Sequence, residues 1–240
     1  MRHTIVKQVV SLKGFFVLLL TSPIWFLIID RFYGVYVAKR MCRDDGGETM
    51  FASTYVGGYL RSAEMIGAYC VDCMTALPAH KFEFIDVYLP TRGHIPGMKE
   101  PGFYRYTLST VDDPRCDVWE NNQQYKGVKH SYPFKADECL AVERLTGPAS
   151  NYSWKQVGTR IPIVGGLFFI GRRDTIVYEV DSARVLSRTR EYSYQSRTTW
   201  LIETASTGFA NADIRCGGQP GIIELLQRTL RDPSKRGTTG

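Results

Sequence analysis

The pattern of apolar and polar positions begins with a long apolar run near the N-terminus. Residues 14–29, GFFVLLLTSPIWFLII, carry no charge, and Lys13 is the only charged residue over 9–29. A helix of about 21 residues rises roughly 30 Å, which is enough to cross the hydrocarbon core of a bilayer. We therefore predict a transmembrane anchor over residues 14–30, with a start as early as residue 9, behind an N-tail of residues 1–13.

A cleaved signal peptide is the alternative interpretation of this run. Cleavage needs small residues in an A-x-A-like arrangement just after the apolar core. The sequence there is IWFLIIDRFYGVY, which contains no such arrangement. We therefore favour an anchor that is retained in the mature protein.

Helical spacing continues beyond the anchor. Phe32, Tyr36 and Arg40 recur at intervals of four residues, as positions on one helix face do. We predict a helical extension over residues 31–45. The glycine pair that follows, Gly46-Gly47, is suited to a left-handed helix end, although acidic residues just before it are unfavourable at a helix C-terminus.

Beyond the glycine pair, apolar and polar residues alternate with the period of two that is typical of half-buried strands. DSA at 181–183 predicts the turn of a hairpin, and GIIELLQRTL at 221–230 has the spacing of an amphipathic helix. We predict strands over 48–60 with an interruption at Gly57-Gly58, 81–89, 103–110, 138–145 and 198–206, two or three strands between 160 and 195 with further turns at 165–166 and 171–174, and helices over 62–77 and 221–230.

These elements predict an α+β fold class, in which an N-terminal transmembrane helix is followed by a mostly antiparallel β domain with a few helices. The domain is expected to cover residues 46–230, and residues 231–240 are expected to form a flexible tail. At 240 residues, the chain is long enough for one full-sized domain with such appendages.

The net charge of +6 raises the question of nucleic-acid binding, but its distribution argues against that role. Residues 1–45 hold seven Lys/Arg and three Asp/Glu, whereas the other 195 residues hold 23 and 21. Most of the excess therefore flanks the apolar run. A short basic N-tail resists crossing the membrane, whereas long domains cross largely regardless of charge. We expect the tail in the cytoplasm, the main domain outside it and no nucleic-acid partner.

The six cysteines all lie downstream of the apolar run, and their number is even. Outside the cytosol an even set suggests disulfides. Six cysteines allow fifteen complete pairings, and the sequence alone does not choose among them. The disulfide candidates are Cys42, Cys70, Cys73, Cys116, Cys139 and Cys216.

The motif CVDC, Cys70 to Cys73, has a spacing with chemistry of its own. A redox dithiol needs its first thiolate stabilised at a helix N-terminus, but the pair falls inside the predicted helix over 62–77, and Asp72 would raise a thiol pKa. A zinc site needs four ligands, and Cys70, Cys73 and His80 supply three weak candidates. We favour a structural disulfide or buried thiols and keep the redox and metal interpretations open.

An arginine- and tyrosine-rich stretch follows the predicted hairpin turn. Arg188, Arg190, Tyr192 and Tyr194 alternate onto one face of a strand. This face could bind an anionic ligand such as an envelope polymer or lipid headgroups. It could also be the ordinary solvated side of an antiparallel sheet, which is the interpretation we favour.

Short phrases spread over residues 30–200 form a set: MCRDDGGETMF after the anchor, CVDCM, KFEFIDVYL, DPRC, ECLAVERL with a following SNYSW, and VLSRTREYSY before TTWL. Together they resemble a family of uncharacterised single-span proteobacterial membrane proteins. The family has no assigned activity, so no functional residue carries over. The resemblance implies a bacterial origin and an anchored extracytoplasmic domain.

These observations favour a single-pass protein of the bacterial inner membrane with a periplasmic main domain. The chain has no G-x-S-x-G, Walker loop or paired-carboxylate signature, so we lean away from an enzyme and expect no cofactor. The predicted partners are the lipid bilayer, through the N-terminal helix, and an envelope protein. The alternative is a membrane-tethered thiol-redox or metal-dependent enzyme centred on Cys70 and Cys73.

Overall fold

The structure, a computed structural model, describes Trp25 and residues 29–61, 70–90, 100–116, 131–164, 168–196, 214–216 and 221–231. The predicted transmembrane span lies almost wholly outside these residues, as do the predicted N-tail and the predicted strand over 198–206. Among the helices that are described, none combines the length and the apolar character that crossing a membrane needs.

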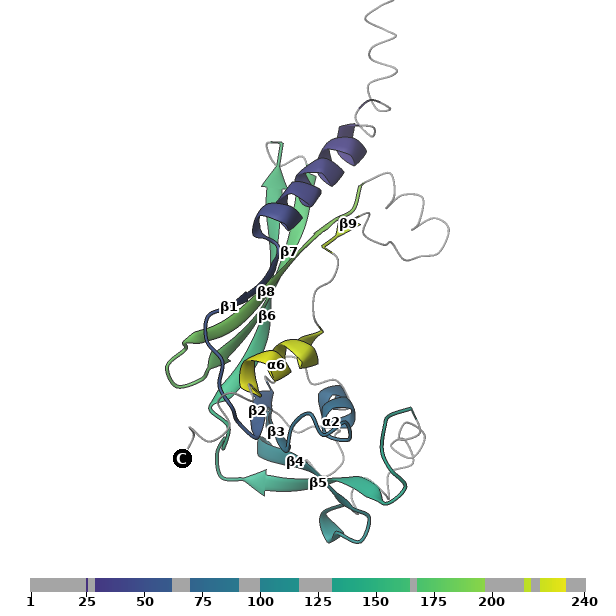
Figure 1. The fold of residues 1–240 in the computed structure, drawn as a ribbon, viewed down its shortest axis with the longest axis vertical. Coiled ribbons are helices and arrows are strands. Elements are labelled where there is room, and N and C mark those ends of the chain that lie inside the picture. The colour runs from purple at the N-terminus through teal and green to yellow at the C-terminus, as the bar shows by residue number, and fades with distance from the viewer. Residues whose placement is uncertain are drawn as a thin grey trace, which may run out of the picture. The chain divides into compact units, whose positions relative to one another are not determined.

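The described strands form one sheet in the order β1-β8-β7-β6-β2-β3-β4-β5, with β9 paired to β8 (Figure 1). β2 is parallel to β3 and β6, whereas β3–β4, β4–β5 and β8–β9 are antiparallel pairs. The prediction of a mostly antiparallel α+β domain is thus confirmed. The strands are β1 Gly47–Met50, β2 Gly58–Arg61, β3 Phe84–Leu89, β4 Gly102–Thr110, β5 Glu138–Leu145, β6 Tyr152–Ile163, β7 Phe168–Glu179, β8 Val185–Tyr194 and β9 Ile214–Arg215.

The chain forms two compact units. The first unit consists of residues 1–47, 158–173 and 190–219, and the second of residues 48–157, 174–189 and 220–240. Each of β6, β7 and β8 contributes residues to both units. Residues of the domain predicted over 46–230 therefore belong to both units.

In the first unit, residues 29–45 form a helix that ends at the glycine pair, as predicted. The Gly46 N–H donates to the carbonyl oxygens of Met41 and Cys42, at 3.0 and 3.1 Å. A Cβ at Gly46 would lie 2.4 Å from the Cys42 carbonyl oxygen, and Gly47 has a φ of +119°. Both positions therefore need glycine, and β1 starts directly after the helix.

In the second unit, two helices pack against the sheet to form the core (Figure 1). α2 spans Val71–Ala76, and α6 spans Ile222–Leu230, where the predicted apolar face buries Leu225, Leu226 and Leu230. The buried side chains of both helices pack with residues of β2 to β8. This tertiary packing explains why α2 is stable although it is short. The buried sheet residues include Tyr59, Ile85, Val87, Tyr104, Tyr106, Leu140, Trp154, Val177 and Leu186.

A buried carboxylate on β3 links three segments of this unit. Asp86 is fully buried and accepts hydrogen bonds from Arg105 Nε at 2.8 Å and Arg105 Nη2 at 3.1 Å. It also accepts from the backbone N–H groups of Ala149 and Ser150, at 3.1 and 2.9 Å. The guanidinium group of Arg105 lies over the ring of Phe84, 3.7 Å from its centroid. The Asp86 charge is therefore fully compensated.

The turn predicted at residues 171–174 is wrong, because β7 runs straight through it. A Cβ at Gly171 would lie 2.7 Å from Ser193 Oγ, so this glycine allows two strands to approach closely. Asp174 is buried. Long-range strand pairing therefore overrides the turn-like composition of GRRD.

Arg231, which we assigned to the flexible tail, is part of the second unit. Its backbone forms an isolated antiparallel bridge with Tyr55, and its guanidinium group lies over the Tyr55 ring. Arg231 Nη1 donates to Glu83 Oε1 at 3.1 Å. The residues after Arg231 lie outside the described part of the chain.

Candidate functional site

The CVDC motif lies at the N-terminus of α2. Cys70 is the N-cap residue, with a ψ of 85°, and its sulfur accepts from the backbone N–H of Cys73 at 3.3 Å. The continuous helix predicted over 62–77 is wrong at Cys70, because this backbone angle is not helical. The predicted N-terminal half of that helix lies outside the described residues. The position of the cysteine pair therefore no longer argues against a redox dithiol, which needs its first cysteine at a helix N-terminus.

Two side chains of β2 contact the CVDC motif. Arg61 Nη1 lies 3.4 Å from Cys70 Sγ and 3.6 Å from Asp72 Oδ2, and the Tyr59 hydroxyl approaches the same oxygen at 3.5 Å. Burial raises the pKa of the Asp72 carboxyl, and the positive charge of Arg61 opposes that shift. Burial also raises the pKa of Tyr59. No local pattern in the sequence points to Arg61, because its contact with Cys70 joins two separate elements.

The exposure of the two sulfurs decides what this site can do. Cys70 and Cys73 are 1% and 0% exposed and form a disulfide with each other. Thiol–disulfide exchange requires a thiolate to reach one of the sulfurs. In this buried state the pair is therefore a structural staple.

In this geometry the three candidate metal ligands, Cys70, Cys73 and His80, do not form a metal site. The two sulfurs are bonded to each other and are not thiolates, and His80 Nε2 faces Glu138 Oε1 at 3.9 Å. Within the described part of the chain, no group of three His, Cys, Asp or Glu side chains could hold a metal ion.

The arginine–tyrosine face of β8 meets acidic groups of this same chain. In the first unit, the Tyr192 hydroxyl and Arg190 Nη1 both donate to Asp45 Oδ2, each at 2.5 Å. The Tyr194 hydroxyl donates to the carbonyl and the carboxylate of Asp30. Burial and the Asp45 carboxylate raise the pKa of Tyr192. Three of the four residues predicted to face an anionic ligand thus bind the helix over 29–45.

Arg188, the fourth residue of the predicted face, lies in the second unit. It is half-buried, and its Nε has no hydrogen-bond partner within the described chain. The predicted face is therefore divided between the two units, and its role in binding an external anion stays a prediction.

Small side chains let the helix over 29–45 approach the sheet. Gly34 is buried against the Tyr194 ring, and Ala38 packs with Ile170. Near the helix end, Cys42 forms a disulfide with Cys216. The helix is thus held by packing, by hydroxyl–carboxylate hydrogen bonds and by a covalent bond.

We expect Gly34→Ala to destabilise the first unit. The new Cβ would lie 2.0 Å from Tyr194 Cζ, and overpacking of this kind costs roughly 1–3 kcal/mol. At an exposed helix position the change from glycine to alanine stabilises a protein by about 1 kcal/mol. The sign of the stability change therefore shows whether Gly34 is packed against Tyr194 or exposed. Hydrogen exchange of the helix over 29–45 measures the effect.

Gly147→Ala is the matched control, because a Cβ at Gly147 meets nothing within 4 Å. Its hydrogen-exchange pattern should stay unchanged. Slower exchange in Gly34→Ala than in the parent chain would show that the helix does not pack on Tyr194.

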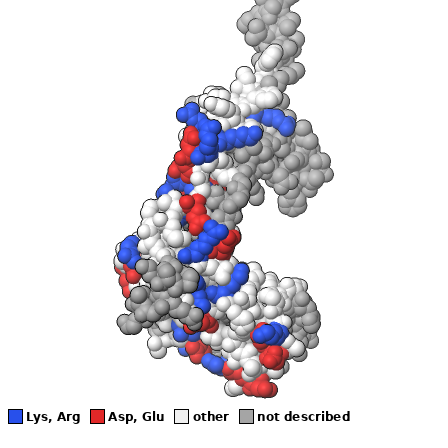
Figure 2. Space-filling view, in the orientation of Figure 1, with Lys and Arg blue, Asp and Glu red and all other residues white. Residues whose placement is uncertain are grey.

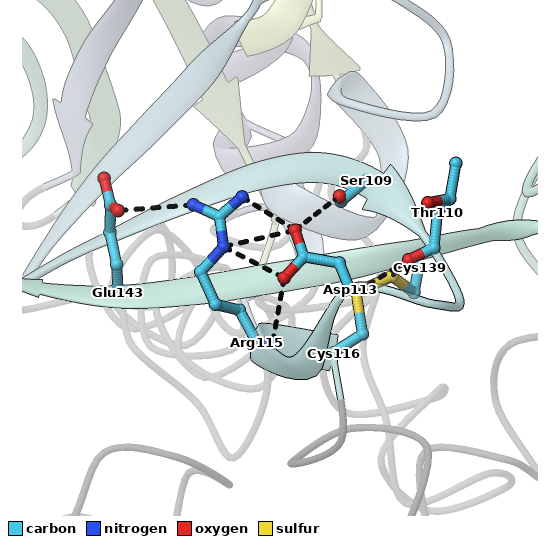
Figure 3. A network of polar contacts seen from close by, with 7 residues as sticks. All are labelled: Ser109, Thr110, Asp113, Arg115, Cys116, Cys139 and Glu143. Atoms are coloured by element: carbon cyan, nitrogen blue, oxygen red, sulfur yellow. Dashed lines mark hydrogen bonds and ion pairs between the residues drawn. A yellow bond between two sulfur atoms is a disulfide. The ribbon is translucent and has the colours of Figure 1, made fainter.

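A polar network lies beside the third disulfide, Cys116–Cys139, at the end of the β4–β5 hairpin (Figure 3). The short 3-10 helix η2, Pro114–Cys116, follows β4. Asp113 accepts from Ser109 Oγ at 2.7 Å, and from the backbone and guanidinium groups of Arg115. Arg115 Nη1 also donates to Glu143 Oε2 at 3.3 Å. These contacts hold η2 against the hairpin, and we assign them a structural role.

The Asp113 carboxyl should make this network sensitive to acid. Its hydrogen bonds from Arg115 and Ser109 lower its pKa far below the ordinary value of 3.8. A group with a depressed folded-state pKa stabilises above its unfolded-state pKa and loses that contribution as pH falls. We expect the melting temperature to fall below about pH 4 less steeply in Asp113→Asn than in the parent chain.

Asp112→Asn is the control for this pH series, because Asp112 is exposed on the same turn. It should leave the acid limb of the pH profile as steep as in the parent chain. Equal slopes for Asp113→Asn and the parent chain would contradict the assignment.

The basic and acidic side chains are mixed on the molecular face that Figure 2 shows, and neither sign forms a continuous patch there. This distribution gives no support to a nucleic-acid surface on that face.

No protein-family model matches the chain, and no curated protein or solved structure matches it either. The resemblance to single-span proteobacterial proteins therefore stays a prediction.

Proposed function

We propose that the chain is a single-pass protein of the bacterial inner membrane whose main domain lies in the periplasm and acts as a non-catalytic interaction or structural module. The observation that carries the proposal is the pairing of all six cysteines in three disulfides. Disulfides persist in oxidising compartments and are rare in the reducing cytosol. Two of the three close loops between elements that are distant in sequence, as structural staples do.

The helix over 29–45 supports a position of the first unit close to the bilayer. It directly follows the predicted anchor and is joined to the rest of its unit by Cys42–Cys216. Phe32 and Tyr36, one helical turn apart, are 72% and 61% exposed. Aromatic side chains of this kind are enriched where proteins meet the membrane–water interface. The bilayer is therefore the first proposed partner, and an envelope protein is the second.

The oxidation state of the cysteines in the expressed chain tests the compartment. The full chain is expressed in a Gram-negative host and treated with a maleimide-coupled polymer after denaturation, with and without reductant. We expect no gel shift before reduction and a shift of six polymer units after it. Ready labelling of all six cysteines without reductant would rule out the periplasmic proposal.

A thiol-redox enzyme is the second candidate function. The observation that favours it is the position of Cys70 at the N-cap of α2, beside the Arg61 guanidinium. In such a reaction a dithiol substrate would pass two electrons and two protons to the Cys70–Cys73 disulfide, leaving a substrate disulfide and two cysteine thiols. The buried sulfurs would first have to become accessible.

Cys70→Ser/Cys73→Ser separates the two candidates. The full chain is assayed for oxidation of a dithiol peptide, with Cys116→Ser/Cys139→Ser as the matched control. A structural staple predicts no dithiol oxidation by the parent chain or either variant. Turnover that disappears only in Cys70→Ser/Cys73→Ser would establish the redox function instead.

A further inference from the structure

A second surface of the first unit carries a cavity of about 330 Å³. It is lined by residues of three strands, β6, β7 and β8. Volumes of this size lie at the lower end of the range for small-molecule sites. The residues that bear on its chemistry are Gly158, Arg160, Gly171, Arg173, Glu191 and Ser193.

The cavity lies on the sheet face away from the helix over 29–45. Ile161, Ile170 and Tyr192 belong to the cluster that packs with the helix residue Ala38. Side chains alternate between the faces of a strand, so Arg160, Gly171 and Ser193, next to them in sequence, belong to the opposite face. These three residues therefore face away from the helix, whereas Tyr192, which also lines the cavity, contacts the helix through Asp45.

The charge in the cavity is unbalanced. Arg160 and Arg173 are exposed, and within the described part of the chain neither forms an ion pair or a hydrogen bond through its side chain. Arg172 also lines the cavity, so Glu191 supplies one carboxylate against three guanidinium groups. Two cations in one cavity favour an anion between them, and guanidinium groups offer several donors in a fixed geometry that matches phosphate oxygens.

Two glycines keep the floor of the cavity open. A Cβ at Gly171 would lie 2.7 Å from Ser193 Oγ, so a larger residue there would displace this hydroxyl. A Cβ at Gly158 would meet nothing within 4 Å. Glycine in a strand interior often marks a bulge, a bend or a place where a ligand or another backbone approaches closely. At Gly158 no protein atom does so, which leaves room for a ligand.

We propose that this cavity binds an anionic ligand through a phosphate group, with Arg160 and Arg173 as its charged contacts and the Ser193 hydroxyl as a further donor. A phosphate group is tetrahedral and directs its oxygens in three dimensions, so donors from three strands can contact it together, whereas the two oxygens of a carboxylate lie in one plane. The source of the phosphate is either a lipid headgroup or a free phosphate-bearing solute. The proposal holds whether or not the chain is anchored in a membrane.

Titration calorimetry of the full chain in a neutral detergent tests the proposal. One arm uses inorganic phosphate, and the other uses dihexanoyl-phosphatidylglycerol below its micelle concentration. We expect saturable binding of one ligand per chain in at least one arm, weakened by added salt. Binding in the lipid arm alone identifies a headgroup as the source, and binding of phosphate identifies the group itself as sufficient.

Two variants connect that binding to the cavity. Arg160→Gln/Arg173→Gln should weaken binding by roughly tenfold or more, because each lost contact is a charge-assisted hydrogen bond. Gly158→Leu should abolish binding by filling the cavity while both charges remain, without lowering the melting temperature. If Gly158→Leu failed to fold, the arginine variant would still decide the question.

Arg184→Gln is the matched control, because Arg184 is an exposed arginine of the second unit. It should bind as the parent chain does. The proposal is overturned by no binding in either arm, by equal binding of acetate, or by an arginine variant that binds no more weakly than Arg184→Gln.

Discussion

Replacement of Asp86 by alanine is expected to lower the free energy of unfolding of the second unit by about 3–5 kcal/mol. The change leaves the Arg105 guanidinium, which is 19% exposed, without its carboxylate. It also removes the acceptor of two backbone N–H groups, those of Ala149 and Ser150. Urea unfolding followed by tryptophan fluorescence measures the loss, because Trp154 is buried in this core.

Two further variants show whether the charge network or the position itself matters. Asp86→Asn keeps the shape and one acceptor oxygen, so it should cost less than Asp86→Ala. Asp112→Ala removes an exposed carboxylate and should change stability by less than about 0.5 kcal/mol. A loss for Asp86→Ala as small as that of Asp112→Ala would contradict the structural role of this network.

Loss of the Cys42–Cys216 disulfide is expected to destabilise the first unit by up to about 5 kcal/mol in Cys42→Ser/Cys216→Ser. The disulfide joins residues 174 positions apart, and the stabilisation from closing a loop in the unfolded chain grows with loop length. The helix over 29–45 should then lose protection in hydrogen exchange first. Thermal unfolding with and without reductant gives an independent measurement in the parent chain.

The other two disulfides supply an internal comparison. The separations are 23 residues for Cys116–Cys139 and 3 for Cys70–Cys73, which correspond to roughly 3.5 and 2 kcal/mol in the same loop-closure relation. The double Cys→Ser variants should therefore rank in the order of their loop lengths. A larger loss for Cys70→Ser/Cys73→Ser than for Cys42→Ser/Cys216→Ser would show that loop closure is not the main contribution.

Elements with strong local signals were predictable from the sequence. The strand over 138–145 has the bounds of β5, the DSA turn joins β7 to β8, and the apolar stripe of α6 is buried as expected. In each case the local pattern and the tertiary packing favour the same conformation. The helix end at Gly46-Gly47 belongs to the same group, because steric limits on the backbone require glycine there.

Features that depend on long-range contacts were not predictable. Gly171–Asp174 has the composition of a turn but lies within β7, where Ser193 of β8 requires the glycine. The N-cap position of Cys70 and its contact with Arg61 likewise depend on how separate elements meet. A pattern within one segment contains no information about such partners.

The acidic residues at the end of the helix over 29–45 illustrate the same limit. Asp44 and Asp45 lie where the helix dipole disfavours negative charge. In the structure, Asp44 pairs with Arg40 and Arg43, and Asp45 accepts hydrogen bonds from Arg190 and Tyr192. The hydrogen bond from Arg43, with a further one from Arg40, lowers the pKa of Asp44. Compensation by these partners explains a pattern that local rules alone leave unexplained.

Disulfide mapping by mass spectrometry is the decisive test of the proposal that all six cysteines are oxidised in an extracytoplasmic domain. The full chain, expressed in a Gram-negative host and alkylated before lysis, is digested without reduction. We expect two cross-linked peptide pairs, Cys42–Cys216 and Cys116–Cys139, one peptide with the internal disulfide Cys70–Cys73, and no alkylated cysteine. Six alkylated cysteines, or a different set of pairs, would contradict it.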